Sequence, residues 1–237
     1  MANLIVDIGN TALKAAWADG ITLGRTFRYQ GERMTEFILS LMVKERPDVL
    51  IISSVRRLSK QNISRLEQSC ETLLVVDDKV LDKYSLPSFI TPDRAASIIA
   101  SRFLFKSRGC TIFDFGTMLT VDFLDKEGKF TGGCISPGCM TRFKSVNRYS
   151  RNLPLLSLPE ETEDKGISLS ASIASGVISG IMFEIEGYLC KNPENINVFT
   201  GVDANYFAKR MKNSIFVVCN LVLMGLALIA LEYDKTN

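Results

Sequence analysis

The chain has 237 residues, enough to build one or two domains with full hydrophobic cores. Its composition, 46% hydrophobic and 23% charged, is typical of a soluble globular protein, and a net charge of +2 with scattered basic residues gives no indication of nucleic-acid binding. Histidine is absent, which excludes serine–histidine–aspartate and cysteine–histidine catalysis. A carboxylate is therefore the expected general base if the protein is an enzyme.

The chain opens with a β-branched run, residues 3–8, which ends in a turn and returns as a strand over residues 12–18. The same pattern recurs at residues 111–117, followed by an apolar strand over residues 118–124. Asp7 and Asp114 occupy equivalent positions in the two copies, so the pattern is an internal repeat. It predicts two similar lobes, residues 1–110 and 111–237.

Helices and strands are expected to alternate through the rest of the chain, which predicts α/β layers. The polar stretch Ser150–Lys165, which holds two prolines, predicts a long loop or flexible flap. The expected helices cover residues 35–44, 61–70, 92–106, 170–190 and 204–212, and the expected strands cover residues 49–53, 72–76, 130–135 and 197–200.

Residues 215–231 are almost wholly apolar, and the run is slightly shorter than the ~18 residues that suggest a membrane span. The run divides into a short strand at residues 214–218 and a helix that Asn220 would cap. We therefore expect a buried strand and helix and no membrane partner, with a membrane anchor as the alternative.

The six cysteines form no Cys-x-x-Cys pair, and without histidine they cannot complete a zinc knuckle. Scattered free thiols fit a reducing compartment, and the first residues lack the basic start of a signal peptide. The expected location is the cytoplasm.

The turn after Asp7 has the composition of a phosphate site. Gly9 allows backbone amides to approach phosphate oxygens, Asn10 and Thr11 add donors, and Lys14 adds positive charge. Asp7 can orient a magnesium ion through its waters. One such turn often has no function, but two at equivalent places favour phosphate handling and hence an ATP-dependent kinase of small molecules.

Asp93 is the candidate for the general base. It lies at the start of the helix predicted from Pro92, where the helix dipole stabilises negative charge. Arg94 beside it could hold a substrate carboxylate in a fork. On the residues alone, the alternative stays open that Asp93 caps the helix and Arg94 is solvated.

Six short motifs occur in the order found in the type III pantothenate kinases, and the chain resembles this family over essentially its whole length. The resemblance implies the fold of the actin/acetate-kinase superfamily: α/β, with two tandem ribonuclease-H-like lobes of duplicated βββαβαβα type and the active site in the cleft between them. The motifs are Asp7-Ile8-Gly9-Asn10-Thr11, Ser53-Ser54-Val55, Asp93-Arg94, Asp114 to Thr120, Gly132 to Gly138 and Thr200-Gly201.

The resemblance implies ATP-dependent phosphorylation of pantothenate, the first step of coenzyme A biosynthesis, by a homodimer that uses magnesium and a monovalent cation, potassium or ammonium. Asp7 would hold magnesium through water, and Asp114 would bind the monovalent cation. Thr117 would contact ATP from the second lobe. The other ATP-binding residues would be Ile8, Gly9, Asn10, Thr11, Ala12, Leu13 and Lys14.

On the substrate side, the resemblance implies that Asp93 takes the proton from the pantothenate hydroxyl and that Arg94 fixes the pantothenate carboxylate. Two substrate-side positions depart from the family pattern: Thr91 stands where the family has a glycine, and Leu169 stands where it has a substrate-binding threonine. Val202 and Met118-Leu119 depart from it in the glycine turns. The residues expected around pantothenate are Tyr84, Thr91, Pro92, Asp93, Arg94 and Leu169.

These departures keep two alternatives open. The protein could be a non-catalytic nucleotide-binding accessory or regulatory protein of the same family, because the phosphate aspartates are kept while the substrate side changes. It could also be a kinase that acts on another small hydroxylated acid.

Overall fold

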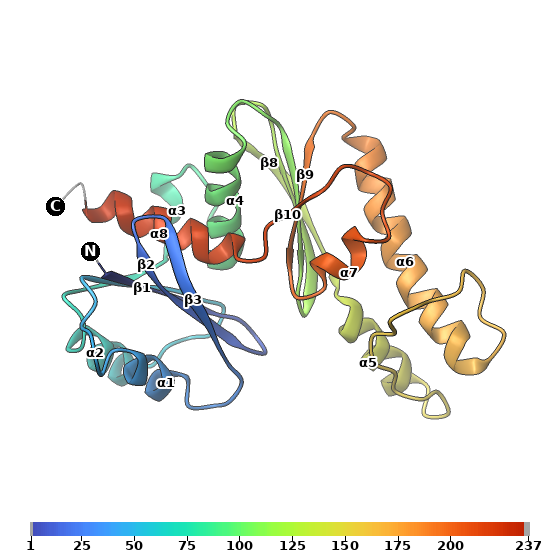
Figure 1. Cartoon of the computed structure of the whole chain (residues 1–237), viewed down its shortest axis with the longest axis horizontal. Coiled ribbons are helices and arrows are strands. Elements are labelled where there is room, and N and C mark those ends of the chain that lie inside the picture. Colours follow the sequence, from blue (N-terminus) through green and yellow to red (C-terminus); the bar gives the residue numbers. More distant parts are fainter. Residues whose placement is uncertain (1, 235–237) are drawn as a thin grey trace. The chain divides into compact units, whose positions relative to one another are not determined.

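The computed structural model describes residues 2–234, which divide into two compact units. The first unit contains the described residues up to Leu104 and those from Asn220 onward, and the second is Phe105–Cys219. Each unit is built on its own five-stranded sheet (Figure 1).

The sheet of the first unit has the strand order β3-β2-β1-β4-β5. β1 pairs antiparallel with β2, and β2 with β3, while β1, β4 and β5 run parallel. β1 and β4 are buried on both faces, which explains their near-continuous apolar sequences. The strands are β1 (Ala2–Ile8), β2 (Leu13–Asp19), β3 (Thr22–Tyr29), β4 (Val49–Ser54) and β5 (Thr72–Val75).

Helices cover both faces of this sheet (Figure 1). On one face, Ile38 of α1 and Leu66 of α2 pack with Leu4 and Val6 of β1. On the other face, Ile99 of α4 and residues of α8 pack with Ile5 of β1. The helices are α1 (Met34–Leu41), α2 (Lys60–Glu67), α3 (Asp78–Lys83), α4 (Pro92–Leu104) and α8 (Leu221–Asp234).

Helix α8 fixes the C-terminal segment in the first unit. Gly225 lies so close to α4 that an added Cβ would be 1.9 Å from the carbonyl oxygen of Ala96. Leu226 and Ala230 of α8 are fully buried. The structure therefore differs from the predicted second lobe, residues 111–237, because the apolar side chains of its last helix are buried in the first unit.

The sheet of the second unit has the order β10-β9-β6-β7-β8. Taken in the reverse direction, this is the strand order of the first unit with the same pattern of antiparallel and parallel pairs. The predicted α/β fold of two tandem, duplicated lobes is confirmed. The strands are β6 (Cys110–Phe115), β7 (Met118–Leu124), β8 (Phe130–Pro137), β9 (Ile196–Gly201) and β10 (Phe216–Val217).

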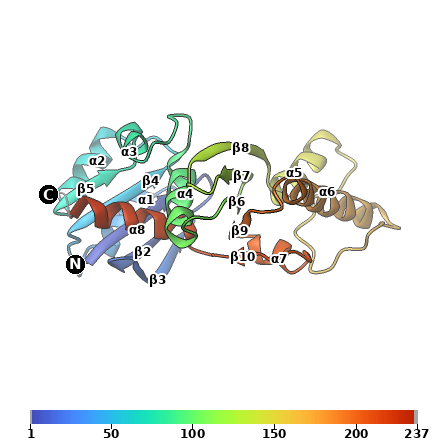
Figure 2. The same cartoon turned by 90° about the horizontal axis from the view of Figure 1, so that it is seen from above.

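One face of the second sheet carries α5 (Cys139–Tyr149), α6 (Leu169–Lys191) and α7 (Ala204–Ala208). Figure 2 shows α5 and α6 side by side. Phe113 and Phe199 of the sheet, Phe143 of α5 and Phe207 of α7 are all fully buried in this core. Aromatic side chains thus dominate the core, as their large buried area favours.

Three elements, β3, α3 and α5, were not among the residue ranges predicted from the sequence, although the implied βββαβαβα type includes a third strand. Residues 150–165 contain no helix or strand, as predicted, but the loop is attached at several points. Ser175 of α6 donates to the Glu163 carbonyl at 2.6 Å, and the Arg210 guanidinium donates to the Glu160 carbonyl. The same guanidinium stacks on the Tyr206 ring, with its central carbon 3.5 Å from the ring centroid.

The apolar run near the C-terminus forms β10 and α8, as predicted. Among residues 2–234, α6 is the helix with the length and apolar composition of a membrane span. Core helices of soluble proteins pass the same test, so this is weak evidence for a membrane.

Candidate active site

Asp7 stands one residue before the end of β1, where it pairs with Lys14 on β2 and with Ser53 on β4. Paired residues point to the same face of a sheet, so these three side chains form a row across it. Ser53 Oγ donates to Asp7 Oδ1 at 3.1 Å. This row lies on the face that also carries α4, because Ile5, two residues earlier on β1, packs with α4.

The turn between β1 and β2 is narrow at its base and open at its tip. The Gly9 N–H donates to the Ala12 carbonyl at 3.0 Å, while Asn10 and Thr11 are exposed. The predicted phosphate-binding stretch, residues 7–14, is thus one continuous strand, turn and strand in the first unit.

Asp114 occupies the corresponding position on β6, where it pairs with Thr120 and Thr200. The turn that follows is one residue shorter, because the Gly116 N–H donates to the Met118 carbonyl, at 3.0 Å. Gly201 has a φ of +94°, and an added Cβ would be 2.6 Å from Asp114 Oδ1 and 2.5 Å from the Phe115 carbonyl oxygen. Only glycine fits this position, where two oxygens approach the same point.

The two turns differ in charge. Lys14 in the first unit corresponds to Thr120 in the second, because each pairs with the turn's aspartate. The Val55 N–H donates to the Ile8 carbonyl and the Val202 N–H to the Phe115 carbonyl, so the next residues, Arg56 and Asp203, also correspond. Two cationic residues, Lys14 and Arg56, therefore accompany the Asp7 turn, whereas the equivalent positions at the Asp114 turn hold Thr120 and the acidic Asp203. Burial raises the pKa of that Asp203 carboxyl.

These charges suit different ligands. Among residues 2–234, no group of three or more metal-binding side chains is present. A magnesium ion that is held by one carboxylate and by phosphate oxygens does not need such a group, and Asp7 beside cationic side chains matches that requirement. The oxygen atoms of Asp114 and Phe115 are hard ligands that suit a cation, and the positions of Lys14 and Arg56 are taken here by Thr120 and Asp203.

Asp93 lies in the first turn of α4, as predicted, and is half-buried together with Thr91 and Pro92. Its Oδ1 accepts from the Arg94 N–H at 3.0 Å, so Asp93 caps part of its own helix. The Arg94 side chain is only 5% exposed, which contradicts the alternative that Arg94 is solvated. A guanidinium is rarely buried to this degree without a structural or binding role.

Tyr84 lies at the end of α3, and its hydroxyl donates to Glu232 Oε2 of α8 at 2.6 Å. Arg102 of α4 donates to the Tyr84 carbonyl at 2.8 Å, and Lys83 lies 3.7 Å from Glu232. Burial, followed by the hydrogen bond to Glu232, raises the pKa of the Tyr84 hydroxyl. The hydroxyl of this predicted substrate-contacting residue is thus engaged by α8.

Two further predicted residues belong to the second unit. Thr117 is exposed at the tip of the Asp114 turn, and its carbonyl accepts from Thr141 Oγ1 at 2.6 Å. Leu169 is the first residue of α6 and is 55% exposed. Ser168 caps that helix by accepting from the Ala171 N–H at 3.2 Å, so its hydroxyl has a structural task.

The sequence predictions missed Arg56 and Asp203. The internal repeat carries a signal for them. When the two turn aspartates are aligned and the strand pairing is followed to β4 and β9, Arg56 and Asp203 fall at equivalent positions in the two units. That alignment requires knowing which strands pair, and the pairing of β1 with β4 joins residues far apart in the chain.

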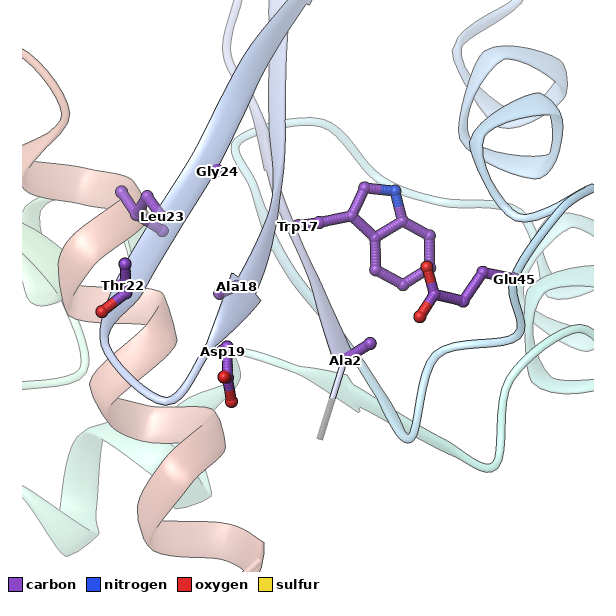
Figure 3. A pocket seen from close by; sticks show the side chains of 8 residues that line it. All are labelled: Ala2, Trp17, Ala18, Asp19, Thr22, Leu23, Gly24 and Glu45. Atoms are coloured by element: carbon purple, nitrogen blue, oxygen red, sulfur yellow. The ribbon is translucent and has the colours of Figure 1, made fainter.

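A cavity of about 430 Å³ lies at the opposite end of β2 from the Asp7 turn. Figure 3 shows the Trp17 ring extending from β2 toward Glu45 at this place. Asp19, Thr22 and Leu23 also line it. Since β2 separates the two places by its full length, this cavity is not part of the candidate site.

Comparison with known proteins points to one family. The family model described as "Type III pantothenate kinase" matches residues 3–191. A type III pantothenate kinase of Cytophaga hutchinsonii is 36% identical over 94% of this chain and 96% of its own length. The enzyme of the same name from Flavobacterium psychrophilum is 32% identical, with the same coverage of both chains.

Solved structures share the fold at much lower identity. A protein of the Baf transcriptional activator family from Campylobacter jejuni superposes with a TM-score of 0.68 and 18% identity, over 98% of this chain and 99% of that one. The activator of 2-hydroxyisocaproyl-CoA dehydratase from Clostridium difficile, with bound ADPNP, has a TM-score of 0.60 and 15% identity, over 100% and 96%. At these identities the likeness concerns the fold alone.

Proposed function

The chain belongs to the type III pantothenate kinase family, and on this basis we propose that it transfers a phosphoryl group from ATP to pantothenate, the first step of coenzyme A biosynthesis. The observation that carries this function is the repeated aspartate turn with unlike charges. The Asp7 turn has Lys14 and Arg56 at the positions where the Asp114 turn has Thr120 and Asp203.

In this function, residues 7–14 hold the ATP phosphates. The open tip at Asn10 and Thr11 presents backbone and side-chain donors, and Lys14 offsets phosphate charge. Asp7, oriented by Ser53, holds magnesium through water. When it is bound, magnesium neutralises charge on the phosphate oxygens, which is the main demand of phosphoryl transfer.

Asp114 is the proposed site of the monovalent cation, potassium or ammonium. The Gly201 backbone supports this role, because any side chain there would meet Asp114 Oδ1 and the Phe115 carbonyl oxygen. The exposed Thr117 at the tip of the same turn is the proposed ATP contact from the second unit.

Asp93 is the proposed general base, which accepts the proton of the pantothenate hydroxyl as the phosphoryl group is transferred. Arg94 holds the pantothenate carboxylate. Thr91, Pro92 and Leu169 line the substrate, and Tyr84 contributes its ring, because its hydroxyl is bonded to Glu232. The exposed Leu169 replaces a polar contact by an apolar one, which predicts weaker substrate binding than in relatives with threonine.

We propose a cytoplasmic homodimer. The exposed side of α6 supports self-association, because added side chains at Gly176 and Gly187 would meet nothing within 4 Å and Phe183 between them is 69% exposed. Sedimentation velocity should give a dimer, and Phe183→Glu should shift it to a monomer. A wild-type protein that sediments as a monomer at micromolar concentration would exclude the dimer.

The kinase function is tested by ADP release from the purified protein, which should require both ATP and pantothenate. Asp93→Asn should lower kcat by at least about a hundredfold, within the ~10²–10⁴ range for a general base, while ATP binding is kept. Asp78→Asn is the matched control, because Asp78 is exposed in the first turn of α3. Normal turnover by the Asp93 variant would refute the base assignment.

Two other functions are alternatives to pantothenate phosphorylation. The altered position 169, where the exposed Leu169 stands, favours a non-catalytic nucleotide-binding protein as the second candidate. ATP binding without turnover of pantothenate would favour it. Turnover of another hydroxylated acid, in preference to pantothenate in a substrate panel, would instead assign a different acceptor.

A further inference from the structure

The side chain of Arg56 reaches the tip of the Asp7 turn from the segment that follows β4. Its Nη2 atom donates to the carbonyl oxygen of Asn10. Ser54 fixes the backbone of Arg56, since Ser54 Oγ accepts from the Arg56 N–H at 3.1 Å and donates to the Arg56 carbonyl at 2.6 Å. These two hydrogen bonds hold the backbone from which the guanidinium reaches the turn.

Much of the binding capacity of this guanidinium is still unused. The contact with Asn10 occupies one of its five N–H donors. Arg56 is exposed, and among residues 2–234 it forms no ion pair with a carboxylate. A neutral carbonyl does not compensate its charge. A guanidinium with spare donors at an open turn is matched to an oxyanion that accepts two parallel hydrogen bonds, such as a phosphate group.

The second unit provides an internal comparison. Asp203 stands where Arg56 stands in the first unit, as the corresponding hydrogen bonds of Val55 and Val202 show. A residue that only stabilised this kind of turn would be useful in both copies. The charge is instead reversed, which separates the turn that would attract an anion from the turn that would attract a cation.

We propose that Arg56 is a further nucleotide-binding residue. Its guanidinium donates to the Asn10 carbonyl of the turn and moves to oxygens of the nucleotide polyphosphate when that group binds beside Asp7. This role rests on the proposed kinase function, but it concerns only the nucleotide and can be measured without turnover.

The test is isothermal titration calorimetry of ATP, ADP and adenosine against the full-length wild type and Arg56→Ala. We expect Arg56→Ala to weaken ATP binding at least about tenfold, which is about 1.4 kcal/mol. The adenosine affinity of Arg56→Ala should stay within about twofold of the wild-type value, because adenosine lacks the phosphates to which the guanidinium would donate. The ATP affinity of Arg56→Lys should lie between those of wild type and Arg56→Ala, since lysine keeps the charge but cannot form two parallel hydrogen bonds.

Arg57→Ala is the matched control: it removes the same charge from the adjacent exposed residue and should change ATP affinity by about twofold at most, because exposed charges are screened by salt. Equal ATP affinity in wild type and Arg56→Ala would overturn the assignment, as would parallel losses for ATP and adenosine, which would mean that Arg56 only shapes the turn. Wild type could fail to phosphorylate pantothenate while Arg56→Ala still loses affinity for ATP and not for adenosine. In that case the proposed kinase function is refuted and the role of Arg56 in nucleotide binding stands.

Discussion

The close packing of Gly225 against α4 predicts a large and localised loss of stability for Gly225→Ala. The added Cβ would be 1.9 Å from the carbonyl oxygen of Ala96 and 2.5 Å from its carbonyl carbon. Contacts below 3.0 Å essentially do not occur, so α8 must move away from α4 by about 1 Å or more. The obstacle is backbone, which no side-chain rotation can remove.

The magnitude follows from two opposing effects. Overpacking in a core costs ~1–3 kcal/mol, and a backbone obstacle places this site at the upper end. Against this, alanine stabilises the helix by ~1 kcal/mol, because its helix propensity is higher than that of glycine. The net loss should be about 2 kcal/mol, which for a chain of this size lowers Tm by ~4–8 °C.

Hydrogen exchange followed by mass spectrometry would locate the loss, since it reports on each unit separately. Peptides from β1 and α4 should lose protection, while peptides from β6 and β9 should keep it. Gly180→Ala is the matched control, because the added Cβ would be 3.7 Å from Arg142 Nη1, an ordinary contact with the end of a flexible side chain. Wild-type stability in Gly225→Ala, or an equal loss of protection in both units, would refute the packing of α8 against α4.

Three further substitutions test separate features of the structure. Gly201→Ala should reduce the stimulation of ADP release by potassium, because its Cβ would lie 2.6 Å from Asp114 Oδ1; an unchanged potassium titration would contradict this. Burial raises the pKa of Asp203 above 3.8, so its proton is lost from the unfolded chain first and its contribution to stability falls as pH rises through the raised pKa. The Tm of Asp203→Asn minus that of wild type should therefore increase as pH rises. If the two plots of Tm against pH are parallel, the effect is excluded. Tyr84→Phe should cost ~1 kcal/mol for the lost bond to Glu232, with the KM for pantothenate changed by about twofold at most. A larger rise would show that the hydroxyl reaches the substrate.

The sequence was sufficient for the features that depend on neighbouring residues. The β-branched runs before Asp7 and Asp114, each followed by a glycine turn, carry their own strand and turn preferences, and the repeat made both predictions stronger. The helix that starts at Pro92 was found for the same reason. β3 was missed because most of it is exposed at the sheet edge, so it shows no apolar alternation.

The features that depend on distant partners could not be obtained in this way. Tyr84 bonds Glu232, which lies 148 residues later, and no local pattern connects them. The burial of Arg94 contradicts the ordinary preference of arginine for water, so it follows only from the packed structure. The position of Arg56 beside Asn10 likewise depends on the pairing of β1 with β4.

The return of α8 to the first unit has a consequence for the order of events during synthesis. A ribosome delivers the chain from its N-terminus, yet the first unit lacks one of its core helices until the residues after Cys219 have been synthesised. The second unit, Phe105–Cys219, is contiguous and can be completed earlier. The usual sequence, in which the N-terminal domain folds first, is therefore expected to be reversed here. A nascent chain stalled before Asn220 would then expose the apolar face of the first sheet to chaperones.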